Sequence, residues 1–215
     1  MYVPVTAAQP APALAPVEFA SAAPASFTAP RHTTLEVAGT QLNVLNDHAA
    51  TVSGSLAESA RDGRPGRIVQ LQALVGRGWR TLTQTRTHSG GRFRLTYVPR
   101  SLTSELLRLR FSGDALGSAS HRRIGTLNVY RLAGASWYGG GGGLACGGSL
   151  SSSTLGVANK TLPCGTLVTL RYGGRSIRVP VIDRGPYVAG REFDLTEATK
   201  QALGFGDTGQ VWSTS

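Results

Sequence analysis

Seven or eight short segments of alternating apolar and polar residues fill the chain from Thr33 to Arg131, and they restrict the fold more than any other feature. A period of two is typical of strands with one buried face, and regular spacing without a helical period favours an antiparallel sandwich. We therefore predict an immunoglobulin-like β-sandwich over residues 33–132, with Asp62-Gly63 and Gly90-Gly91 forming tight hairpin turns. The segments are "TLEVAG", "QLNVLN", "ATVSGSL", "RIVQLQALV", "WRTLTQTRT", "GRFRLTYV", "ELLRLRFSG" and "IGTLNVYR".

Residues 1–32 are expected to be a flexible, Ala/Pro-rich linker, partly in polyproline-II conformation. The first 30 residues contain neither Lys nor Arg and no compact apolar core, so no secretory signal peptide is evident. No apolar run approaches the roughly 20 residues that a membrane-spanning helix requires. We expect no transmembrane segment.

The positive charge is concentrated in the first half of the chain. Residues 31–132 contain 15 basic and 6 acidic residues, against 7 and 5 in residues 133–215, within a formal net charge of +10. A basic surface favours anionic partners, such as an anionic wall polymer, although a merely solvated, arginine-rich surface explains the charge better than any specific partner. The arginines form no tight cluster and no nucleic-acid-binding motif surrounds them, so nucleic acid is not an expected partner.

The second half shows a different, glycine-rich pattern that still predicts strands. Residues 166–172 and 176–182 read as strands joined by a turn at Gly173-Gly174, and "GQVWS" supplies a last strand. A short helix is expected after Thr196, which suits the N-cap position, and before Gly204, which suits the C-terminal stop.

Two cysteines, Cys146 and Cys164, are expected to form a disulfide. Their number is even, they lie in a loop-rich segment, and their spacing lacks the Cys/His pattern of a zinc site. Such a bond would contribute about 3 kcal/mol and indicates a compartment outside the reducing cytoplasm. We expect neither a bound metal nor a cofactor.

Three motifs in order, "ASWYG", "LGVANKTLPCGT" and "VPVIDRGPYVAGREFDLTEATKQALG", resemble the double-psi β-barrel domain of rare lipoprotein A-like proteins. This family is related more distantly to expansins and barwin-type domains. The resemblance covers residues 133–215 and implies a six-stranded barrel in a secreted or cell-envelope protein. It implies action on peptidoglycan or another cell-wall polysaccharide, as a lytic transglycosylase. The alternative is a non-catalytic, expansin-like module that binds or loosens the polysaccharide.

The same resemblance makes Asp183 the candidate general acid and leaves Asp194 as a second acid in the cleft. A general acid has to be held at the glycosidic oxygen, at a partly desolvated strand end. Asp183 could instead only hold the Asp-Arg-Gly-Pro turn, and Asp194 could instead cap the helix. The neighbouring Arg184 would favour a charged Asp183.

The remaining candidates would bind glycan rather than react with it. They are Asn159, Arg184, Tyr187, Asp194 and Tyr138, while Trp137 is expected in the core. The family often has histidine at the position of Asn159, and asparagine cannot shuttle a proton. No carboxylate lies between Leu144 and Thr166, where catalytic members carry a glutamate. Only Asp183, Glu192 and Asp194 are near enough in sequence to form the pair that ordinary hydrolysis needs, whereas a transglycosylase can use one acid/base.

Overall fold

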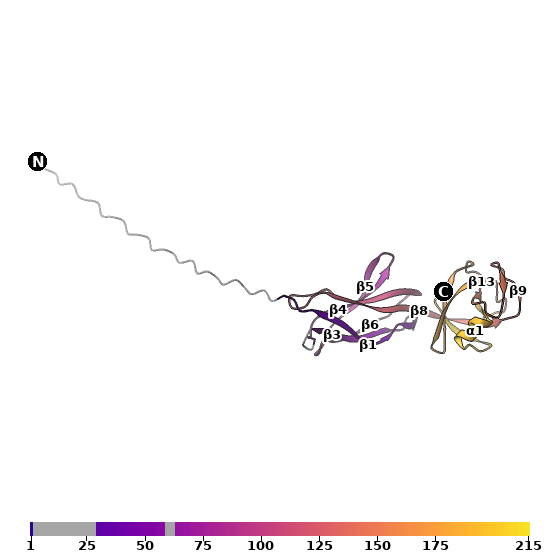
Figure 1. The fold of residues 1–215 in the computed structure, drawn as a ribbon, viewed down its shortest axis with the longest axis horizontal. Coiled ribbons are helices and arrows are strands. Elements are labelled where there is room, and N and C mark those ends of the chain that lie inside the picture. Colours follow the sequence, from indigo (N-terminus) through magenta and orange to yellow (C-terminus); the bar gives the residue numbers. More distant parts are fainter. Residues whose placement is uncertain (2–28, 59–62) are drawn as a thin grey trace.

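A computed structural model describes residues 1, 29–58 and 63–215. The linker expected over residues 1–32 therefore lies almost entirely outside the described residues. The described chain is mainly β with one short helix, and two groups of strands follow one another along its long axis (Figure 1). Within the described ranges, no helix is long and apolar enough to cross a membrane.

Two facing sheets form the first group of strands (Figure 1). One has the order β1-β3-β6, and the other has the order β5-β4-β7-β8, with the short β2 pairing in parallel on β8. Every strand expected from the alternating pattern is present. Their bounds are β1 (Thr33–Gln41), β2 (Asn43–Leu45), β3 (Ala50–Glu58), β4 (Ile68–Val75), β5 (Gly78–Arg86), β6 (Arg92–Tyr97), β7 (Thr103–Phe111) and β8 (Ser120–Tyr138).

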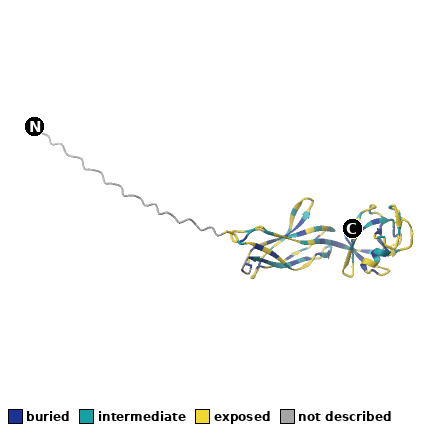
Figure 2. Cartoon of the chain, viewed as in Figure 1, coloured by how far each residue is buried: buried dark blue, intermediate teal, exposed yellow. Residues whose placement is uncertain are grey.

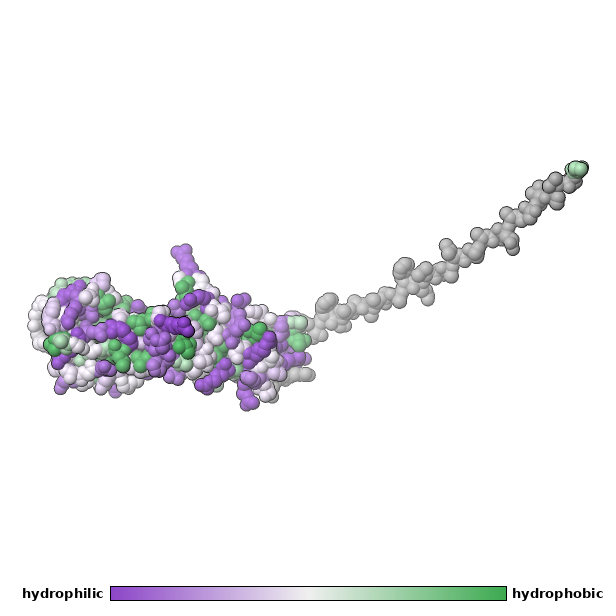
Figure 3. All heavy atoms as spheres, turned by 180° about the vertical axis from the view of Figure 1, so that it is seen from behind, coloured by the Kyte–Doolittle hydropathy of each residue, from purple (hydrophilic) through white to green (hydrophobic). Residues whose placement is uncertain are grey.

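Alternate side chains of these strands fill one hydrophobic core between the two sheets. On β4, for example, Val69 and Leu71 are fully buried, while Ile68 is exposed on the opposite face. The tip of the hairpin of β4 and β5 extends beyond this core, and β5 has no buried residue (Figures 1 and 2). Its tip at Gly76 and Arg77 is exposed, and Figure 3 shows this projection ending in hydrophilic atoms.

The turn at Gly90-Gly91 forms, but the predicted hairpin is wrong. Both glycines have positive φ angles, and the Gly91 N–H donates to the His88 carbonyl over 3.0 Å. The turn nevertheless joins β5 to β6, which belong to different sheets. The turn predicted at Asp62-Gly63 falls partly outside the described residues, because Asp62 is not among them; Gly63 forms an isolated bridge with Gly90, and β3 and β4 belong to different sheets. Turn residues specify a chain reversal, but they do not decide whether the two strands that they join pair with each other.

Strand β8 belongs to both groups. Up to Tyr130 it pairs with β7 and β2, and from Arg131 to Ser136 it pairs with β15 (Thr208–Ser213). Tyr130 is fully buried at the junction, where its ring centroid lies 5.7 Å from that of Trp212. Its hydroxyl donates to Asn43 over 2.9 Å.

The second group of strands closes on itself. The pairings run β8-β15-β12-β13-β11-β14, and β14 returns to pair in parallel with the second half of β8. A separate small hairpin, β9 and β10, lies in the glycine-rich loop. A second hydrophobic core fills the closed ring. The new elements are β9 (Gly142–Gly143), β10 (Ser149–Leu150), β11 (Val157–Ala158), β12 (Leu167–Tyr172), β13 (Arg175–Asp183), β14 (Phe193–Thr196) and α1 (Glu197–Leu203).

The helix and the disulfide agree with the sequence analysis. The Thr196 side chain accepts a hydrogen bond from the Thr199 N–H at the start of α1, and Gly204 ends the helix with a left-handed φ of 65°. Asp194 is therefore not the helix cap. Cys146 and Cys164 form a disulfide with a Cα–Cα distance of 5.6 Å. The predicted turn at Gly173-Gly174 joins β12 to β13, as expected.

Candidate functional site

Asp183 is the last residue of β13, and the fold holds one of its two carboxylate oxygens. Oδ1 accepts hydrogen bonds from the Ala145 N–H over 2.9 Å and from the Arg184 N–H over 2.8 Å. The second oxygen of Asp183, Oδ2, forms no hydrogen bond with a described residue, and Asp183 is only partly buried. Asp183 therefore holds a turn through one oxygen, and its second oxygen makes no hydrogen bond within the described chain.

Asp194 lies on β14, which pairs with β8 on one side and with β11 on the other. Its Oδ1 accepts a hydrogen bond from the Ser136 hydroxyl over 2.7 Å. Burial raises the pKa of Asp194 and the negative charge of Asp183 raises it further, while the bond from Ser136 and the charge of Arg191 oppose the rise. The two aspartates are thus electrostatic neighbours in unequal surroundings.

Tyr138, the last residue of β8, places its hydroxyl near both carboxylates. The hydroxyl oxygen is buried, and burial followed by the charges of Asp183 and Asp194 raises the pKa of Tyr138. The Tyr138 hydroxyl and the Asp183 carboxylate lie close together, but they are not oriented to form a hydrogen bond. Tyr138 therefore stays protonated beside two carboxylates and can donate a hydrogen bond.

Arg184 and Asn159 stabilise the adjoining loop instead of facing Asp183. The Arg184 guanidinium donates to the carbonyls of Asn159 and Leu162 over 3.1 and 2.9 Å, and it forms no ion pair with Asp183 within the described chain. Asn159 is 7% exposed; its side-chain carbonyl accepts from the Thr161 and Leu162 N–H groups, and its amide donates to the Glu192 carbonyl. The polar groups of both side chains are thus engaged within the protein.

Glu192 is directed away from the aspartate pair. Both of its carboxylate oxygens contact the Arg131 guanidinium on β8. The neighbouring carboxylates of the candidate site are therefore Asp183 and Asp194.

The aromatic side chains around the motif differ in exposure. Tyr187 follows the cis Gly185-Pro186 bond and is 82% exposed, so its ring is available to a ligand. Trp137 is 37% exposed, and its expected place in the core is wrong. Its indole N–H donates to Asp207 over 2.9 Å, and the Lys200 ammonium lies 3.8 Å from the ring centroid. Because neighbouring strand residues point to opposite faces, Trp137 cannot share the inward position of Ser136.

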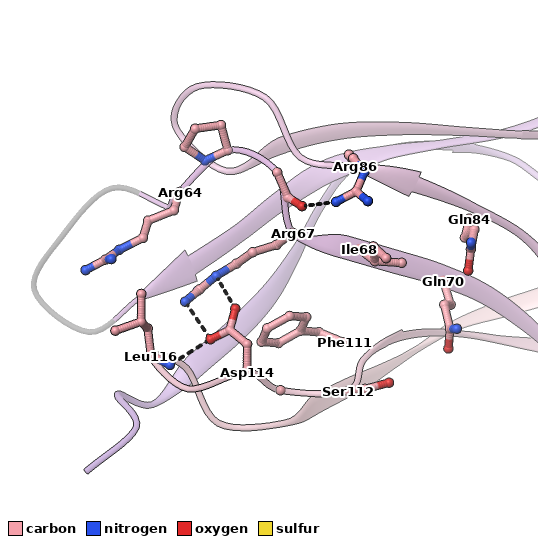
Figure 4. Close-up of a pocket in the computed structure, with 13 residues that line it drawn as sticks. Arg64, Arg67, Ile68, Gln70, Gln84, Arg86, Phe111, Ser112, Asp114 and Leu116 are labelled. Atoms are coloured by element: carbon pink, nitrogen blue, oxygen red, sulfur yellow. Dashed lines mark hydrogen bonds and ion pairs between the residues drawn. The ribbon is translucent and has the colours of Figure 1, made fainter. Parts of the chain in front are cut away.

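A hollow of about 500 Å³ lies in the sandwich and not at Asp183 (Figure 4). Its lining includes Arg64, Gln70, Gln84 and Arg86. Across the described residues, no group of three or more His, Cys, Asp or Glu side chains is placed to hold a metal ion.

The closed ring of strands, with the Asp-Arg-Gly-Pro turn at the end of β13, agrees with the double-psi β-barrel that the sequence resembles. The family model described as "Lytic transglycolase" matches residues 132–212. Among similar proteins are the probable endolytic peptidoglycan transglycosylase RlpA of Aquifex aeolicus, 43% identical over 75 residues, and the endolytic peptidoglycan transglycosylase RlpA of Pseudomonas aeruginosa, 38% identical over 87 residues. Residues 132–212 are therefore an RlpA-like double-psi β-barrel domain.

These matches cover part of each protein. They include 33% of this chain and 33% of the Aquifex relative, and 38% of this chain and 26% of the Pseudomonas relative. Among solved structures, the Streptomyces papain inhibitor is 27% identical with a TM-score of 0.33, over 39% of this chain and 91% of that protein.

Proposed function

We propose that the barrel acts on peptidoglycan as a lytic transglycosylase, with Asp183 as the general acid/base. The position of Asp183 carries this proposal, because one oxygen is fixed by two backbone N–H groups while the other is left for a ligand. The glycosidic bond would break as Asp183 donates a proton to the leaving oxygen. The 6-hydroxyl of the same sugar would attack the anomeric carbon and return its proton to Asp183, forming a 1,6-anhydro product.

The surrounding residues have supporting roles in this proposal. Tyr138 and Asp194 lie beside Asp183, and the Tyr138 hydroxyl, which stays protonated, can donate a hydrogen bond to a carboxylate. Tyr187 offers an exposed ring for stacking on a sugar. Asn159 and Arg184 act as positioning residues, since they hold the loop beside the site.

A specific observation favours the second candidate, a non-catalytic module that binds or loosens wall polysaccharide. The position where the family often has histidine holds Asn159, which is buried and hydrogen-bonded to the backbone. The segment from Leu144 to Thr166 supplies no carboxylate. The same site would then bind glycan without cleaving it.

We also propose how the whole chain is used. The sandwich, residues 33–132, would be an immunoglobulin-like spacer, supported by its two facing sheets and their strand order. Residues 133–215 would form the six-stranded barrel. The protein would be secreted or held in the cell envelope, where the disulfide persists and peptidoglycan is found. The basic sandwich would contact an anionic wall polymer.

Incubation of the purified full chain with peptidoglycan sacculi separates the two candidates. We expect the wild-type protein to release soluble 1,6-anhydro-muropeptides, detected by mass spectrometry. Asp183→Asn should lower the yield by about 100-fold or more, within the contribution of a general acid/base. Asp47→Asn removes the same charge from the sandwich and should leave the yield unchanged. If the wild-type protein releases no product but is retained by sacculi, and Asp183→Asn weakens retention, the binding module is the correct function.

A further inference from the structure

The outer face of the larger sandwich sheet has a positive charge that the barrel does not explain. On β7, Leu107 and Leu109 are fully buried while the alternate residues Arg108 and Arg110 point outward. The strand register places Arg123 of β8 opposite Arg108. On the other side, Gln70 of β4 lies opposite Arg110 and also pairs with Gln84 of β5. We call this surface the arginine face; it consists of Gln70, Gln84, Arg86, Arg108, Arg110 and Arg123.

One guanidinium of the arginine face is fixed before any partner binds. Arg108 lies over the ring of Trp79, with its Cζ 4.1 Å from the ring centroid. Its Nε donates to Gln72 over 2.9 Å, and the Gln72 amide donates to Thr81 over 3.0 Å. A stacked and hydrogen-bonded arginine loses less side-chain entropy on binding than a free one.

The positive charge of this face is not neutralised by carboxylates. No ion pair within the described chain includes Arg86, Arg108, Arg110 or Arg123. On β4, β5, β7 and the sandwich part of β8 the only acid is Glu105, against six arginines. Burial, followed by the charges of Arg110 and Arg123, lowers the pKa of Arg108, so these cations lie close enough to repel one another. An anionic partner would relieve this repulsion.

The arginine face continues into the hollow at the end of the sheet. Gln70, Gln84 and Arg86 line its edge, and Arg64, whose side chain is 40% exposed, lies on its other side (Figure 4). Arg64 and Arg67 both form ion pairs with Glu58, and Arg67 pairs with Asp114 as well, so the charge at this end of the hollow is already partly neutralised. The Cα atoms of cross-strand neighbours are about 5 Å apart, and those of alternate residues along a strand are about 7 Å apart, so the arginines start from closely spaced positions that lead towards the hollow.

We propose that the arginine face binds a linear wall polymer with repeating phosphate groups. The phosphate chemistry follows from the guanidinium fork, which contacts phosphate oxygens in pairs, and residues 29–132 contain no lysine. That the polymer belongs to the cell wall rests on the proposed function of the barrel. A row of three outward arginines on two neighbouring strands suits a repeating anion better than a single small ion.

Binding of soluble poly(glycerol phosphate) to the full chain, measured by calorimetry, tests this proposal. The variant Arg108→Gln/Arg110→Gln/Arg123→Gln should bind about tenfold or more weakly, and the wild-type affinity should fall as salt rises. Arg92→Gln/Arg94→Gln/Arg100→Gln removes the same charge from exposed positions away from the arginine face, two of them on β6, and should stay within about twofold of wild type. The double variant Arg110→Gln/Arg123→Gln leaves the Trp79–Arg108 contact intact and should show a smaller loss, which guards against a folding defect.

Three results would overturn the proposal. An equal loss in both triple variants would mean that net charge alone binds the polymer. Equal binding of poly-glutamate would exclude selection for phosphate, and tighter binding of duplex DNA at the same salt would make nucleic acid the partner. Asp183→Asn should bind poly(glycerol phosphate) as the wild type does. Because the assay contains no peptidoglycan, a failure of the barrel proposal cannot be mistaken for a failure of this one.

Discussion

Asp183 and Asp194 lie close together but differ in their hydrogen bonds and in their burial. Backbone N–H groups fix Asp183, whereas Asp194 is partly buried with a single hydroxyl donor and a negative neighbour. A carboxylate kept in such surroundings lowers stability, which proteins tolerate where the group serves a function.

Asp194→Asn should therefore stabilise the protein at pH 7. Its folded pKa is raised above the unfolded value, so the wild type loses stability as pH rises from the unfolded pKa through the folded one. We expect a gain near the lower end of about 0.5–2 kcal/mol, because the side chain is partly exposed. Thermal unfolding of both proteins from pH 3 to pH 8 measures it. The difference should vanish below the unfolded pKa; a difference that is independent of pH would contradict the explanation.

The sequence predicts which residues form the disulfide and the helix caps better than it predicts where individual side chains point. The cysteine pairing and the helix caps follow from residue type and spacing. The direction of Arg184 does not, because it depends on carbonyl groups of a loop that the disulfide holds in place. Trp137 was misplaced for a similar reason, since its partners Lys200 and Asp207 are distant in sequence.

At the scale of elements, the loop of residues 144–164 links stability to the site. The disulfide anchors it at both ends, the Cys146 N–H donates to the Ile182 carbonyl, and the Ala145 N–H donates to Asp183. Loosening this loop would remove a donor from the carboxylate proposed to react.

Replacing both cysteines, Cys146→Ser/Cys164→Ser, should cost about 3 kcal/mol of stability, the expected effect of a crosslink closing a loop of this size. Denaturant unfolding of the variant and the wild type measures the loss. Reductant should destabilise the wild type to the level of the variant and leave the variant unchanged. A wild-type midpoint that is insensitive to reductant, with its disulfide verifiably reduced, would show that the crosslink contributes nothing.

The strands were more predictable than their partners. Alternation of apolar residues identifies each strand of the sandwich, since the buried face has to be apolar. It cannot decide whether Gly90-Gly91 joins paired strands or opposite sheets, because both arrangements bury the same side chains. After Leu132 the sequence becomes rich in glycine and serine, which weakens the alternation of apolar and polar residues. The continuation of β8 is therefore hard to recognise in the sequence, although its backbone pairing continues.

At the scale of the whole molecule, β8 connects the two cores without an intervening linker. Pairing with β2 ends at Tyr130 and pairing with β15 begins at Arg131. Two contacts stabilise the junction: the Tyr130 ring packs against Trp212, and the Arg131 guanidinium donates a hydrogen bond to Glu192. The two halves should therefore move as one body.

Inserting four Gly/Ser residues between Tyr130 and Arg131 should uncouple the halves while leaving the strand pairings on either side intact. Small-angle X-ray scattering should then show a broader distribution of interatomic distances than for the wild type. The same insertion between Gly173 and Gly174, an exposed hairpin tip, serves as the control and should leave the scattering nearly unchanged. Indistinguishable scattering from the two variants would show that continuity of β8 does not fix the arrangement.

The continuity of β8 affects how the two halves of the molecule would bind two ligands on one surface at the same time. Two sites on a flexible tether sample many separations, and their effective concentration falls as the tether lengthens. Two sites on one rigid strand sample a single separation, so binding at one end increases occupancy at the other only where the target has matching spacing. Such a protein would bind most tightly where two ligands are separated by the distance between its own two sites, even when its affinity for each ligand alone is modest.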